Sequence, residues 1–441
     1  MFQLTLQLYS DGQWQDAMTL LFPEPEKGFD GPCRFGYKQD YLLQNLDLID
    51  SPFMKSVSAR VPLGWDAHNV KKAPAFLHDI APGGAARKIL IKQIGREKPE
   101  GLSIDLFLLG RSTPAPIGHL RVKESFERLD TLAPLGFARQ DVIDRDNRFL
   151  EYAHEQGAAI GGATGAGGEA PKLLMAQSAE GLLYPDATLA DVDVKQHWFI
   201  KFARNRALRL DCDILRSEFM YYKALQALGI ETVPAQGLAL EEGRKPSLWM
   251  QRFDRKVTAQ GVERLAVESM YSLAQVTQAG SDMTHHHVLK LLASLWTQAG
   301  QHDEIPDMVA DYLRRDLLNK ILGNSDNHGR NTAIIRDVDA LRLAPIYDLA
   351  PMVMDDEGIT RTTKWSREVE RAGQINWRAA CESLKEIIDP DSAFERLRAD
   401  AELLRPLPDV LRAQGLPDVT MDHPHIALKH LDQRLREWGL K

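Results

Sequence analysis

Residues 311–348 read DYLRRDLLNKILGNSDNHGRNTAIIRDVDALRLAPIYD. The first part of this stretch places Leu313, Leu317 and Ile321 on one face of a helix and ends at a glycine, so it predicts an amphipathic helix. The polar run SDNHGRN comes next, and the apolar runs TAIIR and LRLAPIY on either side of DVDA predict two short strands. This order predicts a helix that leads into a polar loop and then into a hairpin.

The polar loop carries residues suited to phosphoryl transfer. Asp326 and Asn331 lie five positions apart, as do the base and the metal-binding amide of the protein-kinase catalytic loop. At this spacing one loop can present a carboxylate to an attacking hydroxyl and turn an amide oxygen toward a magnesium ion. Asp348, at the far end of the hairpin, is expected to add a second hard oxygen ligand. His328 is expected either to contact a phosphate or to hold the loop.

A candidate cation lies earlier in the chain. Lys201 stands in the apolar run HWFIKF, which predicts a buried strand, and a lysine in that setting is seldom fully buried without a partner. The next segment, DILRSEFMYYKALQALG, predicts a helix with Asp213 as N-cap and Gly229 as C-cap. Glu218 on this helix is the candidate partner of Lys201. The alternative is that Lys201 extends along an edge strand to solvent while Glu218 is merely solvated.

A glycine-rich run, GAAIGGATGAGG, spans residues 157–168. Glycine lets backbone N–H groups approach a phosphate closely, because it has no Cβ. No G-K-[ST] follows the run, so it is not a Walker A loop, and a flexible linker is the alternative. Lys172, just beyond the run, is a second possible phosphate contact.

The two ends of the sequence differ in pattern. Residues 2–8 alternate between apolar and polar side chains before Asp11-Gly12, which predicts a strand and a hairpin turn. Further on, AARKILIKQIG predicts a helix that ends at Gly95, and a strand is expected near residues 106–109. From about Asp254 onward, helical periodicity dominates. We therefore expect a mixed α/β beginning and a mainly helical end.

Length and composition limit the class of protein. A chain of 441 residues exceeds the size at which single cores stop growing, so two or three lobes are expected. The net charge of −8 argues against a surface coated with basic residues for nucleic acid. The three cysteines are far apart and odd in number, which argues against a disulfide framework. The sequence begins without a basic and apolar leader, and no long apolar stretch follows, so we expect a cytoplasmic protein with no membrane partner.

With these motifs in this order, the sequence resembles the HipA family of toxin kinases over roughly residues 50–370. GATGAGGEAPKLL resembles that family's glycine-rich loop, FIKF resembles its ATP-lysine strand, and MQRFDR resembles the strand and hinge that line the adenine. SDNHGRN resembles its catalytic loop, and PIYD resembles its metal-binding strand end. ARVPLGWDAH and AFLHDIAPGGAARKILIK resemble its leading α/β subdomain.

The resemblance implies an α+β, two-lobed, protein-kinase-like fold. It places an N-terminal α/β subdomain in residues 1–125 and a β-rich N-lobe with the glycine-rich loop in residues 126–253. A mainly α-helical C-lobe with the catalytic loop is expected in residues 254–441.

The resemblance also implies an ATP- and Mg²⁺-dependent serine/threonine protein kinase, a toxin that phosphorylates a cytoplasmic protein. That family implies a translation-related target such as an aminoacyl-tRNA synthetase, autophosphorylation, and an antitoxin partner through which DNA is mainly bound. Asp326 is the implied catalytic residue, and Asn331 and Asp348 are the implied metal ligands. The implied contacts to ATP are made by Gly165, Gly167, Gly168, Lys172, Lys201, Gln251, Arg252, Phe253, His328 and Asn331.

One hydroxyl bears on regulation. In the HipA family, phosphorylation of a serine in the glycine-rich loop switches the kinase off by expelling the loop from the nucleotide site. Thr164 is the only hydroxyl residue between Gly157 and Gln177, so it is the candidate site of autophosphorylation. The alternative is that Thr164 is a small polar turn residue.

Two other functions remain open. Asp326, His328 and Asp348 are a ligand set that a metal-dependent nuclease or hydrolase would also use. A non-catalytic regulator that binds an antitoxin or DNA is the second alternative. The run His285-His286-His287 is expected to lie on the surface, because three consecutive helical residues point in three directions. The acidic run 355–357 is expected to be solvated.

Overall fold

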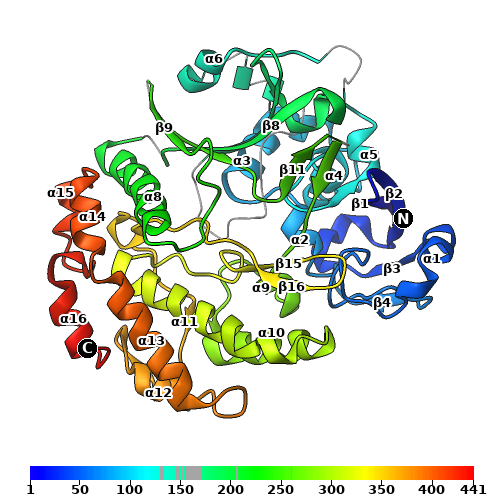
Figure 1. Ribbon diagram of the computed structural model, residues 1–441. Coiled ribbons are helices and arrows are strands. Elements are labelled where there is room, and N and C mark those ends of the chain that lie inside the picture. Colours follow the sequence, from blue (N-terminus) through cyan, green and yellow to red (C-terminus); the bar gives the residue numbers. More distant parts are fainter. Residues whose placement is uncertain are drawn as a thin grey trace.

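The computed structural model describes residues 1–129, 134–145, 149–150, 152–153, 171–204, 207–243, 245–259 and 261–441. Figure 1 shows an N-terminal sheet unit, drawn in blue, beside a β-rich lobe drawn in green and above a helical lobe drawn in yellow to red. No helix among the described residues is both long enough and apolar enough to cross a membrane.

The N-terminal unit is built on a five-stranded sheet with the strand order β4-β3-β2-β1-β5. β1 and β2 form the predicted hairpin, and Asp11 and Gly12 both have positive φ, as its two-residue turn requires. The buried side chains of Leu4, Leu6 and Leu8 begin a hydrophobic core of this unit. Its main elements are β1 Phe2–Ser10, β2 Gln13–Phe22, β3 Cys33–Tyr37, α1 Gln39–Gln44, β4 His68–Val70, α2 Leu77–Ile80, α3 Gly84–Ile94, α4 Ile104–Arg111, β5 Leu120–Val122 and α5 Lys123–Phe126.

The strand expected near residues 106–109 is wrong, because these residues lie in the helix α4. Ser103 caps the helix, since its Oγ accepts a hydrogen bond from the N–H of Leu106 at 3.2 Å. Leu106, Phe107, Leu108 and Leu109 are all buried. An apolar run that is buried on all sides has the same pattern in a helix and in a strand, which explains the error.

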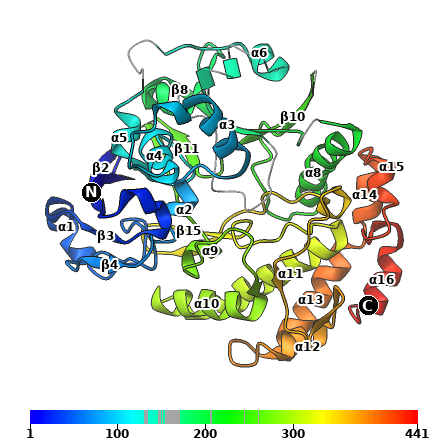
Figure 2. The same cartoon turned by 180° about the vertical axis from the view of Figure 1, so that it is seen from behind.

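The β-rich lobe contains a second five-stranded sheet, with the order β7-β6-β8-β10-β9. Along β8, Trp198, Ile200 and Phe202 enter one core with Trp249 of β10. Helix α8 connects this lobe with the helical lobe and lies beside α14 and α15 in both views (Figures 1 and 2). The main elements of the lobe are α6 Arg139–Asp144, β6 Lys172–Ser178, β7 Leu183–Pro185, β8 Val194–Phe202, α8 Arg209–Ala227, β9 Ala239–Glu242 and β10 Pro246–Gln251.

Helix α8 begins earlier than predicted. Its first residue is Arg209, and the carboxylate of Asp211 accepts a hydrogen bond from the N–H of Leu208 at 2.9 Å. Asp213 is therefore inside the helix, where it pairs with Arg216 at 3.0 Å, and it is not the N-cap. Gly229 follows the end of the helix with a φ of 76°, the conformation expected of a C-terminal glycine.

The helical lobe is organised around the long helix α11, whose last residue precedes Gly323 with a φ of 71°. The predicted hairpin follows as β15 and β16, and β13 extends it to three strands. The elements of this lobe are β11 Arg255–Thr258, β12 Gly261–Arg264, β13 Ala266–Ser269, α9 Met270–Leu273, β14 Met283–Thr284, α10 His285–Gln298, α11 Ile305–Leu322, β15 Ala333–Arg336, β16 Leu341–Leu343, β17 Thr363–Lys364, β18 Glu370–Arg371, β19 Gln374–Ile375, α12 Trp377–Glu382, α13 Pro390–Leu404, α14 Leu407–Ala413, α15 Asp418–Met421 and α16 Leu431–Glu437.

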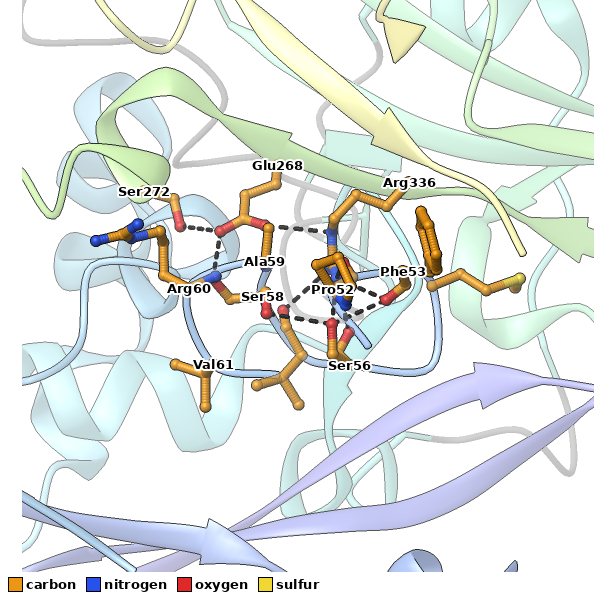
Figure 3. A network of polar contacts seen from close by, with 12 residues as sticks. Pro52, Phe53, Ser56, Ser58, Ala59, Arg60, Val61, Glu268, Ser272 and Arg336 are labelled. Carbon is orange, nitrogen blue, oxygen red and sulfur yellow. Dashed lines mark hydrogen bonds and ion pairs between the residues drawn. The ribbon is translucent and has the colours of Figure 1, made fainter. Parts of the chain in front are cut away.

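A buried polar network attaches the N-terminal unit to the helical lobe (Figure 3). The guanidinium of Arg336 on β15 donates to the carbonyl oxygens of residues 52, 53, 56 and 57 at 3.0–3.2 Å. Its partner Glu268 on β13 lies 3.2 Å away and accepts hydrogen bonds from Ser58 Oγ and the N–H of Ala59. The ion pair is thus surrounded by neutral groups, most of them from a single N-terminal segment, which fixes the position of the unit.

Candidate active site

A cavity lies where the three parts of the chain meet. Seven of the residues singled out from the sequence line it, and they come from β6, β8, α8, β10 and the segments that follow β10 and β16: Lys172, Lys201, Glu218, Gln251, Arg252, Phe253 and Asp348. The glycine-rich residues Gly165, Gly167 and Gly168, and Thr164, lie outside the described residues.

Buried charges meet at one end of the cavity. Lys201 Nζ lies 2.5 Å from Glu218 Oε2 and 2.5 Å from Asp348 Oδ1. Lys172 Nζ lies 3.2 Å from the other oxygen of Asp348. Burial alone would raise the pKa of Asp348, but the two neighbouring ammonium groups lower it far below its ordinary value. Asp348 is therefore a carboxylate held ionised between two lysines, and Lys201 is paired rather than extended to solvent.

The backbone of Asp348 is also unusual. Its φ is 53°, a left-handed conformation that a residue with a Cβ rarely adopts. The following residue, Leu349, donates its N–H to Tyr222 Oη at 3.3 Å, and Tyr222 in turn donates to Glu218 at 3.0 Å. Helix α8 thus holds both the partner of Lys201 and the turn that carries Asp348. Backbone strain of this kind is often found at functional sites.

The polar loop after α11 brings its predicted residues together. His328 Nε2 lies 3.5 Å from Asp326 Oδ1, and His328 Nδ1 accepts the N–H of Arg330 at 3.2 Å. The second contact places the ring proton on Nε2, facing the carboxylate. Burial lowers the pKa of His328, whereas burial and the nearby charge of Asp348 raise the pKa of Asp326. His328 therefore holds the loop as a neutral ring and orients Asp326.

Asn331 presents an amide oxygen without a partner. Its Nδ2 donates to the carbonyl oxygen of Asp326 at 2.6 Å, which fixes the amide plane across the loop. Its Oδ1 is buried and has no hydrogen-bond partner among the described residues. Buried polar atoms are seldom left unpaired, so this oxygen is open to a partner that lies outside the described residues. A magnesium ion would suit it, because Mg²⁺ binds one or two protein oxygens together with phosphates, and Asp348 is the candidate for the second ligand.

The polar loop requires a glycine at position 329. A Cβ on Gly329 would lie only 2.3 Å from Cδ1 of Tyr271. The loop backbone therefore rests directly on this ring, and the carbonyl oxygen of Gly329 accepts the N–H of Tyr271 at 3.1 Å. Asn327 secures the other side, because its Nδ2 donates to the carbonyl oxygen of Thr363 at 2.8 Å.

The hinge residues serve two purposes. The rings of Phe253 and Tyr347 are stacked with 5.7 Å between their centroids, and both line the cavity. Arg252 also lines it, but its guanidinium is paired with Asp186 and with Asp254, so its charge is neutralised within the protein. The hinge thus offers aromatic surface toward the cavity and a buried ion-pair network behind it.

Two expectations about nearby residues are wrong. His285 is buried rather than on the surface: its Nδ1 lies 2.8 Å from Tyr312 Oη, and its Nε2 lies 3.4 Å from Asp316. In the acidic run, Asp355 is buried and pairs with Arg204 at 3.0 Å. Both errors have the same cause, because a local run of polar residues does not reveal a partner elsewhere in the chain.

The cavity also contains residues that sequence patterns did not indicate. Asp79 of α2 and Ile117 come from the N-terminal unit, and Ser269 and Arg330 come from the helical lobe. Arg330 lies inside the polar loop, directly before Asn331, so the loop itself was a signal for it. No local signal points to Asp79 or Ile117, because both reach the cavity only through the docking of the N-terminal unit.

Comparisons with known proteins show the family of this chain and its fold. The family described as HipA-like C-terminal domain matches residues 164–402, more than half of the chain. HipA in a complex with HipB and operator DNA from Shewanella oneidensis MR-1 is similar in structure, with a TM-score of 0.65 and 17% sequence identity, covering 99% of this chain and 96% of that one. The Helicobacter pylori proinflammatory kinase CtkA aligns with a TM-score of 0.39 and 13% identity, covering 63% of this chain and 93% of that one. No curated protein matches the sequence. The two-lobed, kinase-like α+β fold with an extra N-terminal α/β subdomain is confirmed.

Proposed function

This chain belongs to the family that carries the HipA-like C-terminal domain, and on that premise we propose that it is an ATP- and Mg²⁺-dependent serine/threonine protein kinase. One observation carries the proposal: Asp348 is a carboxylate held between two buried lysines, and its charge acts on Asp326 of the loop in which Asn331 has a buried amide oxygen without a hydrogen-bond partner among the described residues. Phosphoryl transfer requires this combination of cations and hard oxygen ligands, because catalysis rests on positioning and on charge stabilisation.

Each residue has a distinct task in binding. Phe253 and Tyr347 offer aromatic surface to the adenine, with Gln251 beside them. Lys201 and Lys172 face the phosphates, and Glu218 holds Lys201 in place from α8. Asn331 and Asp348 would hold Mg²⁺, which would supply positive charge against the phosphates. Lys172, Lys201 and the magnesium ion together would outweigh the negative charges of Glu218 and Asp348, so the site would attract a polyanion.

Asp326 is the proposed catalytic residue. Its carboxylate accepts the proton of a substrate serine or threonine hydroxyl while the oxygen attacks the γ-phosphorus and the bond to ADP breaks. The burial that raises its pKa makes it a better proton acceptor than an exposed carboxylate. The neutral ring of His328 keeps the carboxylate facing the site without supplying a competing positive charge.

The biological setting is part of the proposal. The Shewanella oneidensis structure contains HipA, HipB and operator DNA from a toxin–antitoxin system. We infer that this chain is likewise a toxin with an antitoxin partner, and that DNA is bound mainly through that partner. The proposed substrate is a protein of the translation apparatus, such as an aminoacyl-tRNA synthetase, and the proposed location is the cytoplasm.

Transfer of labelled phosphate to protein tests the activity. The full chain is incubated with Mg²⁺, ATP labelled at the γ-position, and cell extract, and the labelled proteins are analysed for phosphoserine and phosphothreonine. We expect label on protein hydroxyls that disappears when Mg²⁺ is chelated. Label that appears only as inorganic phosphate would contradict a protein kinase.

The hydrolase alternative fits the geometry less well. It needs Asp326, His328 and Asp348 to converge on metal, but the described part of the chain contains no group of three His, Cys, Asp or Glu side chains arranged to hold a metal ion. It also assigns no task to Lys172 and Lys201. The same labelling experiment separates the two functions, because a hydrolase would release phosphate without labelling protein.

A further inference from the structure

The cavity has three chemically different sectors. Lys172, Lys201, Glu218 and Asp348 make the charged end. The apolar sector consists of Phe199, Val233, Met250, Phe253, Ala333 and Tyr347. The third sector is polar and differs from the other two. It consists of Asp79, Ser269 and Arg330, with Ile117 and Val267 beside them.

The carboxylate of Asp79 is fixed in this third sector. It accepts the N–H of Ser269 at 2.9 Å through Oδ2 and the hydroxyl of Ser269 at 2.7 Å through Oδ1. Its side chain remains 18% exposed, toward a cavity that it lines. Because each carboxylate oxygen has a second lone pair, Asp79 can accept further hydrogen bonds without losing Ser269.

Arg330 faces Asp79 with unused hydrogen-bonding capacity. Its Nε lies 3.8 Å from Asp79 Oδ1, which is beyond hydrogen-bond distance, and has no hydrogen-bond partner in the described part of the chain. The side chain is only 7% exposed, so bulk water does not readily satisfy this nitrogen. The fixed hydrogen-bond acceptor Asp79 therefore lies next to Arg330, whose Nε has no hydrogen-bond partner among the described residues.

This sector is tied to the catalytic loop. Arg330 directly precedes Asn331, its N–H is bound by His328, and its carbonyl oxygen accepts Tyr347 Oη at 2.6 Å. Arg330 thus connects the polar sector to Tyr347, whose ring belongs to the apolar sector, and to the loop that carries Asn331. In a nucleotide, the sugar likewise connects the base with the phosphates.

We propose that Asp79 and Arg330 form the ribose subsite of the nucleotide site, a role that rests on the proposed function. Each ribose hydroxyl is a neutral group that both donates and accepts, so the diol can donate to Asp79 and accept from Arg330. A phosphate would be repelled by the Asp79 carboxylate, and a flat base fits better against the aromatic rings of Phe253 and Tyr347 in the apolar sector. The N-terminal subdomain is then a structural part of nucleotide recognition, because it supplies Asp79.

The subsite gives the protein a preference for ribonucleotides. A deoxyribose would leave a buried acceptor or donor unpaired, which costs about 1–3 kcal/mol. That cost corresponds to roughly a 5- to 150-fold weaker affinity. A substitution of Asp79 that abolishes hydroxyl recognition should therefore weaken ATP binding while leaving deoxy-ATP binding nearly unchanged.

Calorimetry on the full chain with Mg²⁺ tests this. ATP, 2′-deoxy-ATP and 3′-deoxy-ATP are titrated into the wild type, Asp79→Ala, and the matched control Asp105→Asn, whose carboxylate lies on α4 and pairs with Arg87 at 3.0 Å. We expect the wild type and the control to prefer ATP over at least one deoxy analogue by 5-fold or more, and Asp79→Ala to lose that preference.

Equal affinities of the wild type for all three nucleotides would overturn the subsite, as would an unchanged preference in Asp79→Ala. The wild-type comparison needs no variant, so it decides the matter even if Asp79→Ala does not fold. Failure of the proposed function looks different, because the wild type would then bind no nucleotide of any kind.

Discussion

Two buried clusters of charge in this molecule differ in how their charges are satisfied. At the docking interface, Glu268 is 3% exposed in its side chain and is surrounded by Arg336 and neutral donors. At the candidate active site, Asp348 is 15% exposed, lies between two lysines, and has a strained backbone. Buried charge by itself therefore does not indicate a functional site. A carboxylate that also lines a cavity, as Asp348 does, is the better indicator.

The largest effect is expected at the catalytic loop. Asp326→Asn removes the proton acceptor but keeps the shape of the side chain, so phosphate transfer should fall by about 10²- to 10⁴-fold. Affinity for ATP should change little, because Asn331 and Asp348 remain. Rates of label transfer and calorimetric titrations measure the two quantities, with Asp337→Asn on the exposed hairpin turn as the control. An equal loss of ATP binding would reassign Asp326 to a structural role.

Substitutions in the charge cluster at the docking interface, Glu268 with Arg336, should change the stability of the protein rather than its catalysis. Glu268→Ala leaves the buried guanidinium of Arg336 without its carboxylate, and breaking a buried pair in this way costs about 3–5 kcal/mol. Chemical denaturation measures the loss in the free energy of unfolding. The double variant with Arg336→Met should lose less than the sum of the single changes, because the pair is then absent. Strict additivity would show that the two side chains do not act together.

The smallest effect concerns pH at the same interface. Burial, and then the charge of Arg336, lower the pKa of His119 to about 3, whereas an unfolded histidine titrates near 6.5. The unfolded chain therefore takes up a proton first as pH falls, and stability that is complete above pH 6.5 declines below it. The slope approaches about 1.4 kcal/mol per pH unit for this group.

Melting temperatures of the wild type and of His119→Gln between pH 7.5 and 5 measure this contribution. The variant should lose less stability than the wild type across that range, because glutamine does not titrate. If the melting temperatures of the two proteins fell in parallel with pH, His119 would not contribute to the acid sensitivity.

The sequence predicted local arrangements such as the pairing of Lys201 with Glu218 on one wall of the cavity, for a physical reason. Spacing within the loop from Asp326 to Asn331 is local, and the apolar run around Lys201 required a partner that the next helix supplied. The other wall depends on docking across long stretches of chain: Asp79 reaches Ser269, 190 positions later. Ile117 is positioned because Gly118 binds Asp254 and Arg255 of the hinge at 2.7 Å. No pattern in a single segment encodes such contacts, and the same limit explains the errors at His285 and Asp355.

The most direct test of the proposed site is whether Asp348 couples ATP binding to magnesium. Calorimetric titration of ATP with and without Mg²⁺ is performed on the wild type, on Asp348→Asn and on the exposed control Asp337→Asn. We expect Mg²⁺ to strengthen ATP binding by at least about tenfold, or 1.4 kcal/mol, in the wild type and the control, and we expect Asp348→Asn to lose this gain. Magnesium dependence that persists unchanged in a folded Asp348→Asn would contradict this expectation.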